Sequence, residues 1–173
     1  MAKLTFNGGI HPYDGKDLSK DKPIKAVLPK GDLVYPLSQH IGAPAKPIVE
    51  KGDHVLTGQK IAEAGGFVSA PIYATVSGTV KAIEPRRVVT GDSVMSIIIE
   101  NDGLYEEVEY PERKPLEEMT REEIIECVKE AGIVGMGGAG FPTHVKLSPK
   151  EPEKIDYVIA NCAECEPYLT SDY

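Results

Sequence analysis

The sequence predicts an α+β protein, in which an all-β module precedes the start of an α/β domain. From residue 33 to about residue 100, short apolar runs alternate with turn residues, a spacing typical of a unit with many short strands. Residues 120–131 instead place apolar side chains at helical spacing. The next stretch, residues 135–143 (Gly-Met-Gly-Gly-Ala-Gly-Phe-Pro-Thr), holds four glycines within six positions. We infer two units of different architecture.

Composition narrows the classes of function. The chain has 173 residues, enough for one domain or two small ones. Its net charge of −8 disfavours a nucleic-acid partner, because the phosphate backbone is negative. The sequence has no apolar stretch long enough to span a bilayer and no signal-peptide core, so we expect a cytoplasmic chain without direct membrane insertion. Three cysteines, an odd count, argue against a disulfide framework.

The predicted β module ends in a charged linker. Residues 101–118 combine Pro, Gly and clustered charges, which is typical of a connection between domains. We therefore place an N-terminal arm at 1–32, the β module at 33–111 and a second domain at 112–173.

The second domain begins with a helix. Thr120 and Glu123 have the spacing of a capping box, and Gly132 is placed to end the helix in a left-handed conformation. Further along, residues 155–160 (Ile-Asp-Tyr-Val-Ile-Ala) form a short apolar run with β-branched residues. Such a run predicts a buried strand.

The glycine-rich stretch is the first candidate binding site. Glycine has no Cβ, so a ligand can approach the main chain, and a run of exposed N–H groups makes an anion-binding concavity. At Gly138 we expect both open space and a positive φ. Thr143, His144 and Lys146 add a hydroxyl, an imidazole and a cation that could reach a phosphate. The alternative is a flexible turn. Residues 135–140 also match the spacing G-x-G-x-x-G, but that fingerprint follows a strand, whereas this stretch follows a predicted helix.

Isolated histidines and a cysteine pair are weaker candidates. His11 and His40 have no metal-ligating partners nearby in the sequence, so we interpret both as structural or surface residues. For His40, a place at an interface or near a redox group is the alternative. Cys162 and Cys165 form C-x-x-C, which is compatible with a redox or zinc site. Zinc needs four ligands, and only one further cysteine and scattered histidines remain, so we expect no metal site.

Two segments of the second domain carry a resemblance to a known family. Residues 135–143, followed by Lys146, resemble the glycine-rich loop of the NADH- and FMN-binding subunit of respiratory complex I. Residues 161–167 (Asn-Cys-Ala-Glu-Cys-Glu-Pro) resemble the acidic loop after the next strand of that domain. Residues 6–12 and 33–45 are similar to the N-terminal half of the RnfC subunits of Rnf ion-translocating electron-transport complexes. The resemblance to that family covers nearly the whole chain.

The resemblance implies that the second domain is the start of a Rossmann-like NADH/FMN-binding domain. The cofactor-binding residues that it implies are Gly135, Gly137, Gly138, Gly140, Phe141, Thr143, Lys146, Asn161, Glu164 and Glu166. Asn161 and Glu164 would lie against the flavin, and Glu166 would help to position the nicotinamide nucleotide. The complex I family has an acidic residue where Ala163 stands and a serine where Cys165 stands, so no contact is carried over at these two positions. No catalytic residue and no metal ligand is implied.

The β module has a resemblance of its own. Residues 49–61 and 70–80 resemble the two halves of a biotinyl/lipoyl carrier domain, which implies a barrel-sandwich fold. A carrier presents its cofactor on a lysine in the hairpin between the halves. Residues 61–80 contain no lysine, and the hairpin at 64–69 offers nothing to acylate. We therefore expect a structural or docking module without a lipoyl or biotinyl group.

For the complete subunit, the resemblance implies electron transfer from NADH via FMN toward iron–sulfur clusters, in a membrane complex that couples electron transfer to ion translocation. Its partners would be the other subunits, and it would lie peripherally on the cytoplasmic face of the inner membrane. We expect this chain to be an N-terminal portion, inactive by itself, with the 4Fe-4S clusters in a missing C-terminal part and none in this portion, because each cluster takes four thiolates.

Two other functions remain open from the sequence. One is a non-catalytic docking module whose lipoyl-like β-sandwich binds partner subunits. The other is a carrier-like protein with an unrelated glycine loop.

Overall fold

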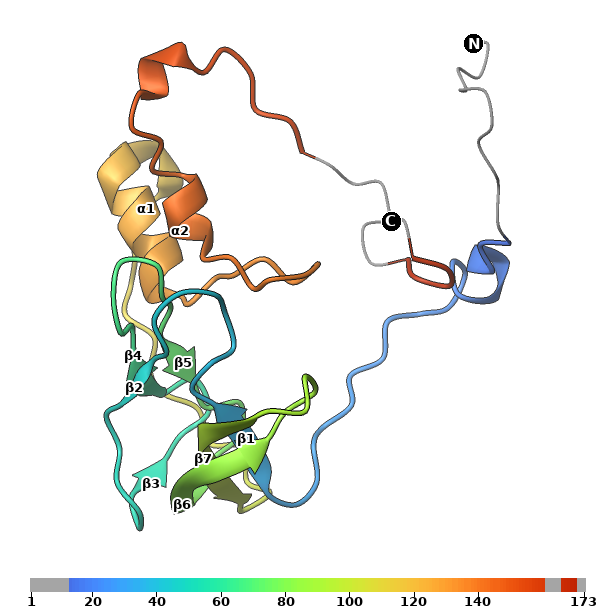
Figure 1. Ribbon diagram of the computed structural model, residues 1–173, viewed down its shortest axis with the longest axis vertical. Coiled ribbons are helices and arrows are strands. Elements are labelled where there is room, and N and C mark those ends of the chain that lie inside the picture. The colour runs from blue at the N-terminus through green and yellow to red at the C-terminus, as the bar shows by residue number, and fades with distance from the viewer. Residues whose placement is uncertain (1–12, 161–165, 171–173) are drawn as a thin grey trace. The chain divides into compact units, whose positions relative to one another are not determined.

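A computed structural model describes residues 13–160 and 166–170 of the chain. These residues belong to two compact units. The larger unit covers residues 28–152 and contains all the strands and both α-helices that are labelled in Figure 1. The smaller unit combines the described residues before position 28 with those from position 153 onward. Each unit is described by itself.

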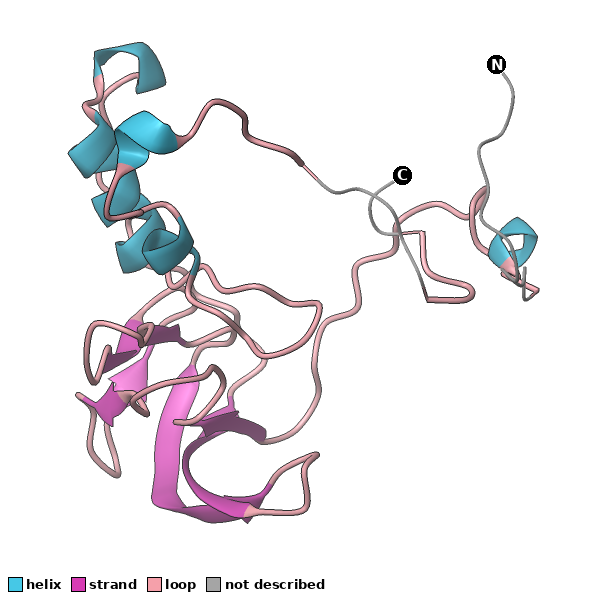
Figure 2. Ribbon diagram, turned by 45° about the horizontal axis from the view of Figure 1, so that its top comes forward, coloured by secondary structure: helices cyan, strands magenta, loops and turns pink. Residues whose placement is uncertain are grey.

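The β module consists of seven strands in two antiparallel sheets. The larger sheet has the strand order β1-β7-β6-β3, and the smaller has the order β2-β4-β5. Figure 2 shows the two long strands of the larger sheet curling along their length. The strands are β1 (Leu33–Pro36), β2 (Lys46–Pro47), β3 (His54–Val55), β4 (Lys60–Glu63), β5 (Ile72–Tyr73), β6 (Gly78–Arg87) and β7 (Ser93–Asn101).

Strand β7 is the central element of the larger sheet. It pairs with β1 on one side and with β6 on the other, in a register that runs from Gly78 opposite Asn101 to Arg87 opposite Ser93. The run 96–99 (Ser-Ile-Ile-Ile) is buried at four consecutive positions, so both faces of the strand are covered here. A buried strand of this kind has a continuous apolar run rather than an alternating one.

The core of the β module lies where the short apolar runs of the sequence meet. Its least exposed side chains are at most 1% accessible and come from both sheets and the segments between them: Val55, Ile61, Val76, Val80, Ile97 and Ile99. The intervening turns need glycine, since Gly52 and Gly58 have φ of +99° and +83°. The predicted all-β unit with many short strands is therefore confirmed.

Helix α1 (Arg121–Glu130) begins and ends where the sequence predicts. The Glu123 N–H donates to the Thr120 hydroxyl at 3.2 Å, and the Thr120 N–H donates to the Glu123 carboxylate at 2.8 Å, which makes the capping box complete. Gly132 has φ of +66°, the left-handed conformation that ends a helix. A one-turn helix, α2 (Thr143–Lys146), follows the glycine-rich stretch. No helix in the described ranges is long and apolar enough to cross a bilayer.

The predicted linker begins against the β module. Residue 57 pairs with this segment, since the Thr57 N–H donates to the Glu106 carbonyl at 2.8 Å and the Val108 N–H donates to the Thr57 carbonyl at 3.0 Å. The Tyr105 hydroxyl donates to the Pro29 carbonyl at 2.7 Å. These bonds hold residues 105–108 along the module before the chain reaches α1.

The sequence-based prediction of a strand at 155–160 is wrong. The segment has no regular secondary structure, and all six residues are exposed, with Val158 94% accessible. A strand needs a neighbour to pair its N–H and C=O groups, and no described strand pairs with this segment. Its apolar side chains therefore have no sheet to join.

The smaller unit brings together the two ends of the described chain. A 3-10 turn at Lys16–Leu18 contacts the segment around Tyr168. The Tyr168 N–H donates to the Asp14 carbonyl at 2.6 Å, and the Ser19 hydroxyl donates to the Tyr168 carbonyl at 2.7 Å. Gly15, with φ of +63°, leaves room for the Tyr168 ring. Nothing in the local sequence patterns predicts this contact.

Replacement of one core side chain tests the central role of β7. Ile97→Ala is expected to lower the free energy of unfolding by about 2–5 kcal/mol, because it leaves a cavity in a fully buried position. Met95→Ala, on the same strand but about half-exposed, is the matched control and is expected to cost less than about 1 kcal/mol. Urea denaturation followed by circular dichroism measures both. Equal losses for the two variants would contradict this packing.

Candidate functional site

The glycine-rich stretch forms a closed loop. Val134 and Pro142 make an isolated antiparallel bridge at its base. The Gly135 N–H donates to the Phe141 carbonyl at 2.9 Å, and the Thr143 N–H donates to the Ile133 carbonyl at 3.0 Å. The loop is therefore an ordered element between α1 and α2, and the flexible-turn alternative does not describe its base.

A pocket of about 330 Å³ opens at this loop. It is lined by Gly135, Gly137, Gly138, Ala139, Gly140, Phe141 and Lys146. The Lys146 ammonium lies 5.7 Å from the centre of the Phe141 ring. A Cβ added to Gly135 would be 3.6 Å from the same ammonium. No carboxylate in the described ranges pairs with Lys146, so its charge is available at the pocket.

The glycines of this loop have different roles. Gly140 has φ of +62°, and a Cβ there would lie 2.6 Å from the Gln39 carbonyl oxygen. Gly137 and Gly138 do not have left-handed φ values, and a Cβ at either would meet no atom of the described residues within 4 Å. The expectation of a positive φ at Gly138 is therefore wrong. Gly140 allows close packing within the protein, whereas Gly137 and Gly138 leave open space for a ligand.

The main chain of the loop has unused donors. Within the ranges that the structure describes, no group accepts a hydrogen bond from the N–H groups of residues 137–140. Successive free N–H groups of this kind form an anion-binding concavity. Together with the Lys146 ammonium, they make the pocket suitable for a phosphate.

His144 does not contribute to this pocket, contrary to the sequence-based expectation. It is only 3% accessible, and its Nε2–H donates to the Phe67 carbonyl at 3.0 Å. Its ring packs edge-to-face on the Phe67 ring, with centroids 5.9 Å apart. Thr143, the first residue of α2, is partly buried and does not line the pocket. Of the three polar residues after the loop, only Lys146 faces the pocket.

The predicted acidic loop is described only in part. Asn161, Glu164 and the C-x-x-C pair lie outside the described residues. Glu166 is exposed and belongs to the smaller unit. Its carbonyl accepts a hydrogen bond from the Lys16 ammonium at 3.2 Å, and the same ammonium donates to the Leu169 carbonyl at 2.6 Å. Sequence reasoning missed this hydrogen bond from Lys16 of the N-terminal arm, because Lys16 and Glu166 are 150 positions apart.

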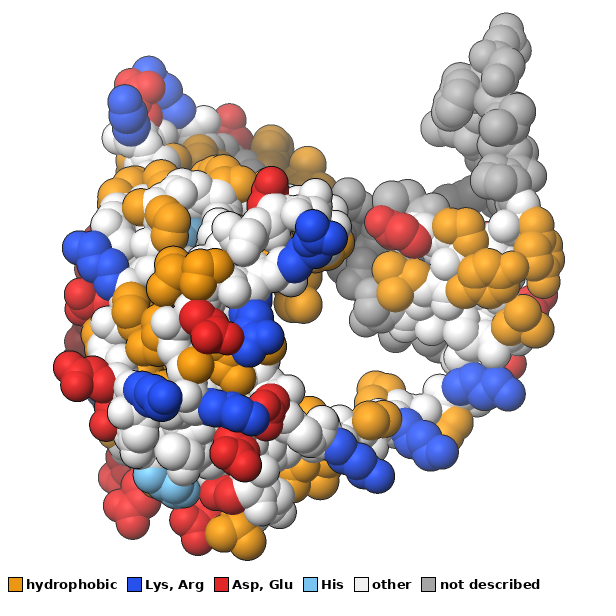
Figure 3. All heavy atoms as spheres, turned by 60° about the horizontal axis from the view of Figure 1, so that its bottom comes forward, with side chains coloured by type: hydrophobic (Ala, Val, Ile, Leu, Met, Phe, Trp, Pro, Cys, Tyr) orange, Lys and Arg blue, Asp and Glu red, His pale blue; other side chains and the backbone are white. Residues whose placement is uncertain are grey.

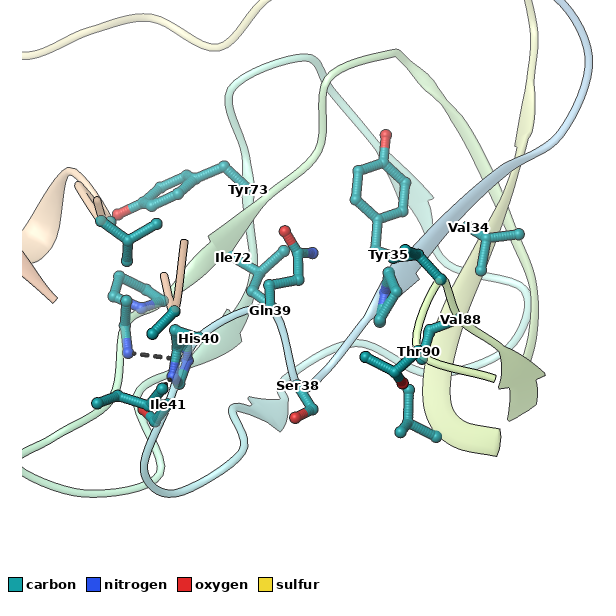
Figure 4. Close-up of a pocket in the computed structure, with 18 of the residues that line it drawn as sticks. Val34, Tyr35, Ser38, Gln39, His40, Ile41, Ile72, Tyr73, Val88 and Thr90 are labelled. Atoms are coloured by element: carbon teal, nitrogen blue, oxygen red, sulfur yellow. Dashed lines mark hydrogen bonds between the residues drawn. The ribbon is translucent and has the colours of Figure 1, made fainter. Parts of the chain in front are cut away.

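A larger groove of about 1000 Å³ adjoins the glycine loop. Figure 4 shows side chains that line it, from strand β1, the turn at 38–41, strand β5 and the tip of the β6–β7 hairpin. Gly138 and Ala139 line both this groove and the smaller pocket. Sequence reasoning missed the groove because no local motif marks a surface assembled from several segments that are distant in the sequence.

An ion pair and a hydroxyl hold the end of α1 to the smaller sheet. The Lys60 ammonium pairs with the Glu130 carboxylate, and this hydrogen bond lowers the pKa of Glu130 and raises the pKa of Lys60. The Tyr73 hydroxyl donates to the Glu130 carbonyl, and burial raises the pKa of Tyr73. Because the ion pair is about one-third to one-half exposed, it contributes roughly 0–1 kcal/mol.

Two ranges of this chain match known protein families. Residues 4–104 match the RnfC barrel sandwich hybrid domain, and residues 128–173 match the Nuo51 FMN-binding domain. The chain belongs to the RnfC family. The barrel-sandwich fold and the family resemblance predicted from the sequence are thereby confirmed, whereas the Rossmann-like detail of the second domain stays a prediction.

Curated relatives cover nearly all of this chain. The subunit designated C in the Na⁺-translocating ferredoxin:NAD⁺ oxidoreductase complex of Acetobacterium woodii is 49% identical over 172 residues, 98% of this chain. The subunit of the same designation in the proton-translocating ferredoxin:NAD⁺ oxidoreductase complex of Clostridium ljungdahlii is 48% identical over 171 residues. Its counterpart in the ion-translocating oxidoreductase complex of Vibrio cholerae is 41% identical over 169 residues. The chain spans only 38%, 37% and 22% of the length of these relatives.

Substitution of Gly140 separates its role from that of its neighbours. Gly140→Ala is expected to destabilise the unit by about 1–2 kcal/mol from the left-handed backbone alone, with a further loss from the contact with Gln39. Gly137→Ala is the matched control, and it is expected to leave the melting temperature unchanged because its Cβ enters open space. Thermal unfolding followed by circular dichroism measures both. A stable Gly140→Ala variant would contradict the observed packing.

Proposed function

We propose that the glycine-loop pocket binds the phosphate of FMN. We further propose that the chain is part of an electron-transfer subunit that takes electrons from NADH via FMN toward iron–sulfur clusters in an ion-translocating membrane complex. The observation that supports this best is the pocket itself, which is lined by residues 137–140 and Lys146. The N–H groups of residues 137–140 donate to no described group, and a Cβ at Gly137 or Gly138 would meet no described atom within 4 Å. The match of residues 128–173 to an FMN-binding domain agrees with it.

The residues present fit a phosphate group. A dianionic phosphate would receive charge-assisted bonds from Lys146, which are stronger than neutral ones. Gly137 and Gly138 let the phosphate approach the main chain, and Phe141 keeps the ammonium on the pocket side of the loop through its ring contact. FMN would supply the redox chemistry, and the protein would bind and orient it.

Further parts of the proposal extend beyond the described pocket. Asn161 and Glu164 would lie against the flavin and Glu166 near the nicotinamide nucleotide, in a Rossmann-like domain that begins at residue 112. Clusters of the 4Fe-4S type would reside in the part of the complete subunit that corresponds to the remainder of the longer relatives. The subunit would lie peripherally on the cytoplasmic face of the membrane and bind other subunits of the complex.

The charge pattern supports a protein or small-molecule partner rather than a nucleic acid. On the face drawn in Figure 3, Lys and Arg side chains of the β module are interspersed with Asp and Glu. Several form surface ion pairs, such as Lys81 with Asp32 at 2.7 Å and Arg86 with Glu84 at 2.6 Å. Binding along a phosphate backbone requires a concentrated positive surface instead.

A bulky residue in the open part of the loop tests the pocket. Gly138→Val is expected to abolish FMN retention in the complete subunit while leaving its melting temperature unchanged, because the added Cβ meets no described atom within 4 Å and the side chain extends into the ligand space. Met136→Val places the same side chain in the same loop at a 96% exposed position outside the pocket, and is expected to retain FMN. Flavin absorbance after purification measures retention.

Gly138→Val protein that keeps FMN and oxidises NADH at the wild-type rate would overturn the phosphate site. The glycine loop would then be only a structural element. The docking alternative, in which the β module binds partner subunits, would become the better account.

Removal of the pocket's cation tests the contribution of charge. Lys146→Ala is expected to weaken FMN binding by about tenfold or more, because a hydrogen bond to a charged group contributes about 1.5–3 kcal/mol. Lys150→Ala changes the net charge equally at an exposed position outside the pocket, and is expected to bind like the wild type. Fluorescence titration of deflavinated subunit gives the dissociation constants. Equal affinities for the two variants would rule out a phosphate contact at Lys146.

A further inference from the structure

His40 organises the turn at 38–41 through both of its ring nitrogens. The Ala70 N–H donates to Nε2 at 3.1 Å, so Nε2 carries no hydrogen and Nδ1 does. Nδ1–H then donates to the Ile41 carbonyl at 2.9 Å. The side chain is only 7% accessible, and Figure 4 shows it at the end of the groove with a hydrogen bond to a neighbouring segment. The neutral imidazole thus ties the turn to the segment that leads into β5.

The same turn contacts the glycine loop backbone to backbone. The Ile41 N–H donates to the Ala139 carbonyl at 3.1 Å. One residue later, Gly140 comes so close to the Gln39 carbonyl that only a glycine fits without displacement. Ile41 therefore links the two: its carbonyl accepts a hydrogen bond from the His40 ring, and its N–H donates to the glycine loop. A change in the orientation of His40 would move the loop's nearest neighbour.

Two more contacts from the β module flank the loop. Before it, the end of α1 is held by Lys60 and Tyr73, both of which bind Glu130. After it, α2 is held by the hydrogen bond of His144 to Phe67, in the hairpin between β4 and β5. The module thus contacts the segment on both sides of the pocket as well as at the loop itself.

We propose that the barrel-sandwich module acts as the positioning platform for the phosphate-binding loop, with His40 as the positioning residue. The proposal rests on the proposed function for its ligand, but its structural part concerns the loop alone. His40 does not itself act on the flavin, since both of its nitrogens are occupied by backbone groups. Its effect passes through the Ile41 N–H to the carbonyl of Ala139, a residue that lines the pocket. Gln39, His40 and Ile41 of this turn also line the adjoining groove.

The test compares substitutions of His40 in the complete subunit. His40→Leu fills a similar volume and removes both hydrogen bonds, whereas His40→Asn can still donate to the Ile41 carbonyl from its amide nitrogen. His54→Leu is the matched control, because His54 lies on β3, is exposed and hydrogen-bonds Asp102 rather than any residue of the loop. Two quantities are measured: amide hydrogen exchange at Ile41 and Gly135, and the dissociation constant for FMN.

In His40→Leu we expect exchange at both amides to become at least about tenfold faster and FMN binding to weaken by about tenfold, because two hydrogen bonds are lost. His40→Asn is expected to recover part of each effect, and His54→Leu to change neither. Unaltered exchange at Ile41 and Gly135 in folded His40→Leu protein would overturn the proposal. If His40→Leu does not fold, His40→Asn takes its place, with exchange at Ile41 and Gly135 expected to be faster than in the wild type at unchanged circular dichroism; unaltered exchange at both amides would overturn the proposal.

The two readouts distinguish the positioning role from the proposed function. If wild-type subunit binds no FMN, the proposed function fails, while faster exchange of the loop amides in His40→Leu still supports positioning. If wild-type subunit binds FMN and His40→Leu binds it equally well with unchanged exchange, only the positioning role is refuted.

Discussion

The structure depends first on the burial of strand β7. Both β1 and β6 hydrogen-bond to it, and Ile97 and Ile99 are fully buried in the core between the two sheets. Each of the short strands β2, β3 and β5 has only two residues, too few to be stable without this core. The long hairpin of β6 and β7 is therefore the main stabilising element of the module. The loops of the module are positioned by the strands that pack on this hairpin. The turn at 38–41 and the hairpin at 64–69 are two of those loops.

These loops of the carrier-like fold contact the segment that follows the β module. In a biotinyl or lipoyl carrier, the hairpin between the two halves presents a modified lysine to solvent. Here the same hairpin holds α2, through Phe67 and His144. The turn at 38–41 supports the glycine loop at Ala139 and Gly140. Two loops of the β module therefore contact the segment that carries the glycine-rich stretch.

Local patterns predicted the parts that depend on neighbours in the sequence. The capping box at Thr120, the left-handed Gly132 and the many short strands of the β module were all recognisable, because caps, turns and strands follow from residues a few positions apart. The same reasoning failed at His144 and at 155–160. It identified an imidazole near a glycine loop and an apolar run of strand length, but the first is buried against the β module and the second pairs with no strand among the described residues.

The sequence by itself determined the β module, helix α1 and the glycine-rich loop with Lys146, since each is encoded in a contiguous stretch of residue types. Only the tertiary structure decided what those glycines do. A Cβ at Gly140 would meet the Gln39 carbonyl, in a segment about a hundred residues away, whereas a Cβ at Gly138 would meet no described residue within 4 Å. Which backbone approaches a glycine is set by the packing of distant segments. That packing is a sum of many weak long-range contacts, and no local spacing encodes it.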